Sequence, residues 1–126
     1  MPKVFVTGHR GMVGSALVRI LQSQRPDWSL LLAGRKELDL LNQTSVDEFI
    51  KSEKPDIIIN AAARVGGIHA NSTYPAEFIH QNLVLNANLI HSAWLHGVNR
   101  FLNLGSPCLY PGHSQQPIKE AYLLTG

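Results

Sequence analysis

Apolar residues occur along this chain in two patterns, as short continuous runs and as longer stretches in which they recur every three or four positions. Continuous runs are typical of strands that are buried on both faces, whereas the longer spacing is typical of helices with one buried face. The runs predict four strands, at residues 4–7, 29–34, 56–63 and 100–106.

Helical spacing follows each of the first three strands. The first helix is predicted to bury one face. A second is predicted to be capped by Thr44 or Ser45 and to end before Pro55, and a third to cover residues 75–97. The apolar face of the first consists of Val13, Ala16, Leu17, Ile20 and Leu21, and that of the second of Val46, Phe49 and Ile50.

Strands that alternate with helices predict an α/β fold, a Rossmann-type doubly wound parallel sheet with ligand sites at the carboxyl ends of the strands. Residues 111–126 have a loop-like sequence with no closing element, so we expect this sheet to be incomplete. The 126 residues suffice for one domain, and no internal repeat or second domain is visible.

Composition and charge limit what the protein is expected to bind and where it is expected to be found. The net charge of +2 is spread without a basic run, so we expect neither nucleic acid nor an anionic membrane as a partner. With no secretion leader and no apolar stretch of about 20 residues, the sequence favours a cytoplasmic protein. One cysteine allows no internal disulfide, and the histidines follow no metal-ligand pattern, so we expect no metal.

Three glycines lie between the first strand and the first helix, in "VFVTGHRGMVGSALVRIL". A phosphate can approach a helix N-terminus only where no side chain intrudes, and there it meets free N–H groups and the positive end of the helix dipole. Glycines at this spacing permit the tight turn, the close approach and the helix packing that a dinucleotide requires. The expected cofactor-binding residues are Gly8, Gly11 and Gly14, together with Met12 and Val13. The alternative is a loop glycine followed by two packing glycines.

Arginines indicate which dinucleotide is bound. NAD enzymes place an acidic residue after the second strand to hold the ribose 2′-hydroxyl, but this chain has Arg35 there and Arg10 in the glycine loop. Two guanidinium groups that converge suit the 2′-phosphate of NADP(H). We place Asp39 and Leu40 at the adenine end of the site. Solvated surface arginines and an exposed turn aspartate are the alternatives.

Small residues follow the third strand in "NAAARVGG". Ala61, Ala62 and Ala63 would let a dinucleotide lie against the backbone, and Gly66 and Gly67 would keep the adjoining loop low. An alanine-rich strand end without a ligand is the other interpretation.

The glycine loop, "AAARVGG", "NSTYPAEFIHQN" and "LGSPCLYP" together resemble the extended short-chain dehydrogenase/reductases, over residues 3 to about 121. The likeness is greatest to members that act on a GDP-sugar. It implies that NADPH reduces the C4 ketone of GDP-4-keto-6-deoxy-D-mannose after epimerisation at C3 and C5, in a homodimer.

The resemblance also implies roles for three residues. Ser106 matches the serine that hydrogen-bonds the substrate's 4-oxygen, and Cys108 matches the acid/base cysteine of epimerisation. Asn82 matches an asparagine that steadies the active-site water and backbone. Judged by residue type alone, Ser106 is a turn or cap residue, Cys108 a buried filler and Asn82 a helix-surface residue.

The chain departs from the family at two points. Tyr74, Tyr110 and Tyr122 each lack the lysine of the family's Tyr-x-x-x-Lys motif, and Pro107 stands where a serine is common. We therefore expect the N-terminal, NADP-binding part of a longer enzyme, inactive alone, with the GDP-binding substrate domain absent. Two alternatives remain open, an NAD-dependent nucleotide-sugar 4-epimerase or 4,6-dehydratase relative and a non-catalytic NADP-binding module.

Overall fold

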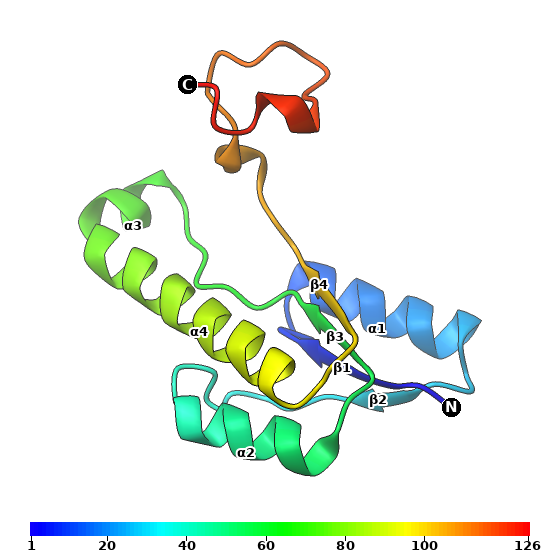
Figure 1. The fold of residues 1–126 in the computed structure, drawn as a ribbon. Helices are drawn as coiled ribbons and strands as arrows, with labels where there is room; N and C mark the ends of the chain where they lie inside the picture. Colours follow the sequence, from blue (N-terminus) through cyan, green and yellow to red (C-terminus); the bar gives the residue numbers. More distant parts are fainter.

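A computed structural model describes residues 1–126 as one parallel sheet with helices on both faces (Figure 1). The strands are β1 (Lys3–Thr7), β2 (Ser29–Leu31), β3 (Ile57–Asn60) and β4 (Arg100–Asn103), in the spatial order β2-β1-β3-β4. Every neighbouring pair is parallel, which confirms the predicted Rossmann-type fold class.

The last three strands end earlier than predicted. Beyond Asn60 the backbone turns away from the ladder, because the N–H of Ala62 donates to the Thr7 hydroxyl and to the Asn60 carboxamide oxygen, both at 3.2 Å. Side-chain oxygens thus accept the hydrogen bond that the N–H of Ala62 would otherwise donate to a neighbouring strand. The alanines expected at the end of the strand form a loop instead.

Helix α1 (Met12–Gln24) covers one face of the sheet. Its predicted apolar face is partly wrong, because Val13 and Ile20 are 46% and 54% exposed. Gly14 is buried, and a stripe next to the predicted one meets the sheet. The residues of α1 that pack against Val4, Val6 and Ile59 are Leu17, Val18 and Leu21.

Helices α2 (Gln43–Glu53) and α4 (Pro75–Leu95) cover the other face. The predicted apolar side of α2 is confirmed, since Val46 and Ile50 are fully buried and the Phe49 ring lies 4.9 Å from that of Phe5. The core on this side also contains Phe5, Leu38, Ile58, Leu85, Leu89 and Ala93.

The predicted start of α2 is wrong. Asn42, not Thr44 or Ser45, is the N-cap, and its Oδ1 accepts a hydrogen bond of 3.0 Å from the N–H of Ser45. Asparagine and serine are comparably good caps, so the sequence alone does not choose between neighbouring candidates.

A short helix, α3 (Ile68–Thr73), precedes α4 and was not predicted. None of its residues is buried, so it has no apolar face for a pattern to reveal. After β4 the chain leaves the sheet, and residues 107–126, which contain only two short 3₁₀ turns, lie apart from it (Figure 1). No helix combines the length and apolar character that a membrane span requires.

Candidate functional site

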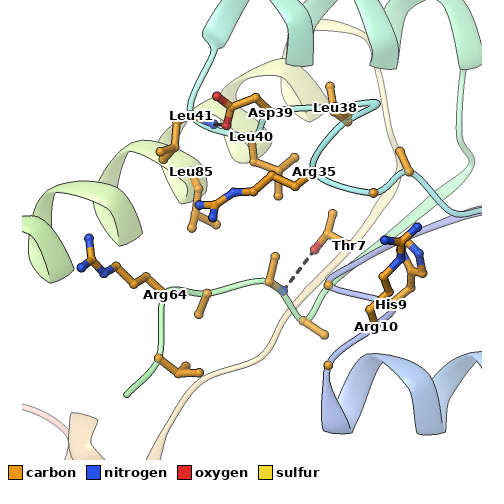
Figure 2. A pocket seen from close by; sticks show the side chains of 18 of the residues that line it. Thr7, His9, Arg10, Arg35, Leu38, Asp39, Leu40, Leu41, Arg64 and Leu85 are labelled. Atoms are coloured by element: carbon orange, nitrogen blue, oxygen red, sulfur yellow. Dashed lines mark hydrogen bonds between the residues drawn. The ribbon is translucent and has the colours of Figure 1, made fainter. Parts of the chain in front are cut away.

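A pocket of about 1000 Å³ opens at the carboxyl edge of the sheet, between the loops that follow β1, β2 and β3 (Figure 2). It brings together all the residues predicted to bind cofactor except Gly14 and Asn82. Those that line it are Gly8, Arg10, Gly11, Met12, Val13, Arg35, Asp39, Leu40, Ala61, Ala62 and Ala63.

Gly8 sets the shape of the pocket floor. Its φ of +64° lies in the left-handed region, and a Cβ there would lie 2.5 Å from the carbonyl oxygen of Ala61. A side chain is excluded on both counts, so the loop after β1 can lie directly against the loop after β3.

The N-terminus of α1 opens into this pocket without a capping side chain. Gly11 is the N-cap, its backbone is extended, and the first turn contains no acidic residue. The N–H groups of the first turn are therefore free to bind an anion at the positive end of the helix dipole. This arrangement fits the pyrophosphate of a dinucleotide.

Three arginines line the pocket, Arg10, Arg35 and Arg64, and none forms an ion pair. Figure 2 shows Arg10 beside His9, whereas Arg35 extends toward Leu40 and Leu85. The two predicted phosphate ligands thus share one pocket, but their guanidinium groups do not converge in this conformation. Both are exposed long side chains, so their rotamers can change when a ligand binds.

The loop after β2 is stiffened by its own acidic residues. The Asp39 carboxylate accepts a hydrogen bond of 3.0 Å from the N–H of Leu41, and the Glu37 carboxylate accepts one from the N–H of Gly34. Asp39 therefore has the turn role considered as its alternative, while still lining the pocket. Leu38 and Leu41, which sequence reasoning missed, add apolar surface beside Leu40.

Polar residues at the strand ends form a hydrogen-bonded network centred on the buried Asn60, next to the pocket. Asn60, which is 2% exposed, accepts from the Thr7 hydroxyl at 2.6 Å and donates to Asn103 at 2.7 Å and Asn86 at 3.1 Å. Thr7, Asn60 and Asn103 are in register across β1, β3 and β4. The sequence signal for this network is the polar residue at the end of each apolar run.

Asn82 holds the loop that bears Arg64. Its Oδ1 accepts from the N–H of Arg64 at 2.8 Å, and its Nδ2 donates to the carbonyl of the same residue at 3.0 Å. The Arg64 guanidinium lies 4.6 Å from the centre of the Phe78 ring. Asn82 is therefore half-buried and engaged with backbone, which rules out a free surface asparagine.

Ser106 and Cys108 lie beyond β4, outside the residues that line the pocket. Ser106 caps a 3₁₀ turn (Pro107–Leu109), with its Oγ accepting from the N–H of Cys108 at 3.2 Å. Cys108 is exposed, so it is not a buried filler. Neither residue shares the pocket with the glycine loop in this arrangement, and their catalytic roles stay predictions.

Four histidines lie on α3 and α4 or directly after α4, at exposed or half-buried positions. His69, His80 and His91 are exposed, and the half-buried His96 contacts Asp47 at 2.7 Å. No three histidine, cysteine or acidic side chains lie together as a candidate metal site.

The fold and pocket can now be set beside known proteins. The model of the NAD dependent epimerase/dehydratase family matches residues 4–126. The chain belongs to this family. The resemblance inferred from the sequence motifs is thereby confirmed.

Within the NAD dependent epimerase/dehydratase family, the chain is 56% identical to the putative GDP-L-fucose synthase 2 of Arabidopsis thaliana and 52% identical to the GDP-L-fucose synthase of Escherichia coli K12. Each alignment covers 98% of this chain and 38% of the relative. MlghC, the GDP-mannoheptose C4 reductase from Campylobacter jejuni solved with NADP bound, superposes with a TM-score of 0.92 at 39% identity, over 99% of this chain and 39% of that one. The chain thus spans well under half the length of these family members.

Proposed function

We propose that this chain is the NADPH-binding part of an enzyme that converts GDP-4-keto-6-deoxy-D-mannose to GDP-L-fucose. The observation that carries the proposal is the uncapped N-terminus of α1 opening into a pocket with unpaired arginines. The identity to GDP-L-fucose synthases over nearly the whole chain supports the substrate.

Each part of the pocket suits a part of NADPH. The glycine loop and the first turn of α1 would hold the pyrophosphate, and Arg10 and Arg35 the 2′-phosphate. Leu40 and its apolar neighbours would contact the adenine, and the alanine wall would let the dinucleotide lie close to the backbone. When bound, the cofactor supplies hydride for reduction of a ketone.

Ser106 and Cys108 are proposed to act on the sugar. A serine hydroxyl can donate to the oxygen of a ketone as negative charge develops on it. A thiol can exchange a proton with carbon next to that ketone. Cys108 has the solvent access that such exchange needs, and it lies two residues from Ser106 on the same turn.

The same proposal divides the protein into parts. Residues 1–126 would form the NADP-binding portion, and binding of the GDP-sugar would need a further portion outside this chain. The relatives, of which the chain covers 38%, support that division. We place the enzyme in the cytoplasm, where NADPH is supplied.

A second copy is the proposed partner. The outer side of α4 exposes large apolar residues, which suits a homodimer interface. They are Ile79, Leu83, Ile90, Trp94 and Leu95, each 49–75% exposed. Sedimentation of the full-length protein would contradict the homodimer if it gave only a monomer at micromolar concentration.

The test of the cofactor proposal is a fluorescence titration of the chain with NADPH and with NADH. We expect tighter binding of NADPH by about tenfold or more, because charge-assisted bonds to the 2′-phosphate are available only there. Equal affinities would contradict NADP selectivity and favour an NAD-dependent relative. Binding of neither would contradict the cofactor role itself.

A second candidate is a C4 reductase that does not epimerise its GDP-sugar. The 39% identity to the NADP-bound GDP-mannoheptose C4 reductase favours it. The two candidates differ in whether protons at C3 and C5 of the substrate exchange with solvent, so incorporation of deuterium from heavy water separates them.

A further inference from the structure

Helix α4 carries three asparagines within two turns, and two of them are hydrogen-bonded to residues that line the pocket, whereas the third is bonded to a residue next to it. Asn82 binds the backbone of Arg64, after β3. Asn86 accepts from the side chain of Asn60, at the end of β3. Asn88 donates to the backbone carbonyl of Leu40, after β2, at 2.9 Å. None of the three lines the pocket itself.

Asn88 occupies a position that packing alone would give to an apolar residue. It is 8% exposed and lies next to the core residue Leu89. A buried carboxamide is unfavourable unless its polar atoms are paired. Its partner is main chain of the segment that also carries Arg35, so the bond fixes the backbone from which the proposed 2′-phosphate ligand extends.

Asn86 is linked to the pocket through the side chain of Asn60. The Asn60 carboxamide has two donors and two acceptor sites, and all are used, by Thr7, Ala62, Asn86 and Asn103. Loss of the acceptor on Asn86 leaves one Asn60 N–H without its partner, so three bonds instead of four hold the Asn60 carboxamide in place. The same group holds the N–H of Ala62, which belongs to the alanine wall.

We propose that Asn86 and Asn88 are positioning residues of the cofactor pocket and that they control different properties of it. This inference rests on the proposed cofactor site. Asn88 sets the loop that carries Arg35, and therefore the preference for NADPH over NADH. Asn86 sets the wall that both cofactors would share, and therefore the affinity for both.

The experiment measures NADPH and NADH affinities, by fluorescence titration, of the wild-type chain and of the Asn88→Ala and Asn86→Ala variants. For Asn88→Ala we expect the NADPH dissociation constant to rise about tenfold with a smaller change for NADH, so the preference falls. For Asn86→Ala we expect both constants to rise about tenfold, with the preference retained.

Val4→Ala is the matched control. Val4 is fully buried on the opposite face of the sheet and does not line the pocket, so this variant should lower the melting temperature without changing either constant. If Asn88→Ala does not fold, Asn88→Leu keeps a side chain of similar size without the donor nitrogen or a buried charge, and the same loss of preference is expected.

The experiment distinguishes failure of this inference from failure of the proposed function. If the wild type prefers NADPH and both asparagine variants bind like Val4→Ala, their role is purely structural and the inference is overturned while the proposed function stands. If the wild type binds neither cofactor, the proposed function fails and the inference fails with it.

Discussion

Gly14 of α1 packs directly on the backbone of Gly8, so closely that a Cβ on Gly14 would lie 2.1 Å from the Gly8 carbonyl oxygen. The neighbouring atom is main chain at the end of β1 and cannot move aside like a flexible side chain. The contact therefore fixes the distance between the sheet and the helix N-terminus that opens into the pocket.

Gly14→Ala should consequently disrupt both stability and the pocket. We expect the free energy of unfolding to fall by about 3 kcal/mol, at the upper end for overpacking, because α1 must move off the sheet. Urea denaturation followed by circular dichroism measures this. Gly112→Ala is the control, since a Cβ there meets nothing within 4 Å. A Gly14→Ala variant as stable as the control would contradict the packing role.

The sequence predicted a parallel sheet of alternating strands and helices, because a strand buried on both faces leaves a continuous apolar run such as Val4–Val6. It predicted the helix-capping residue wrongly, because capping depends on which of several polar side chains has the right backbone geometry. It did not predict α3, whose stability comes from backbone hydrogen bonds and not from a buried face.

Replacement of the capping residue tests the corrected start of α2. Asn42→Ala should lower the free energy of unfolding by about 1 kcal/mol, because it leaves the N–H of Ser45 without its partner. Thr44→Ala, at an exposed position, should change it by less than about 0.5 kcal/mol. Thermal denaturation of both variants distinguishes the two assignments. The reverse order of effects would restore Thr44 as the cap.

Most of the candidate pocket was predictable because its residues are contiguous with a glycine loop and with strand ends, where topology brings ligand sites together. The asparagine contacts of α4 were not, since Asn88 meets Leu40 only through tertiary packing across 48 positions of sequence. Arg64 was missed although it directly follows the alanine wall, because no local pattern assigns a function to a lone arginine.

Charge reversal at Arg35 tests the assignment of the 2′-phosphate. Arg35→Asp should weaken NADPH binding by about 1–3 kcal/mol and spare NADH, because only NADPH carries the phosphate. Lys36→Asp is the control, as it makes the same charge change at the next residue, which does not line the pocket. Equal losses from both variants would indicate a general field effect instead of a specific contact, and titration of each cofactor measures the difference.

The position of Cys108 leads to a prediction about the chemistry of a full-length protein that contains this chain. Cys108 and Ser106 share one exposed turn, yet they are proposed to act in different steps. Cys108→Ser should impair exchange of the substrate's C3 and C5 protons with solvent and leave NADPH affinity unchanged, because the thiol lies outside the pocket.

Ser106→Ala should slow NADPH oxidation by about 100–1000-fold while exchange persists, because it removes a donor to the developing oxyanion. Deuterium incorporation from heavy water, followed separately from NADPH absorbance, measures the two steps. Exchange at the wild-type rate in Cys108→Ser would assign the acid/base role to another residue.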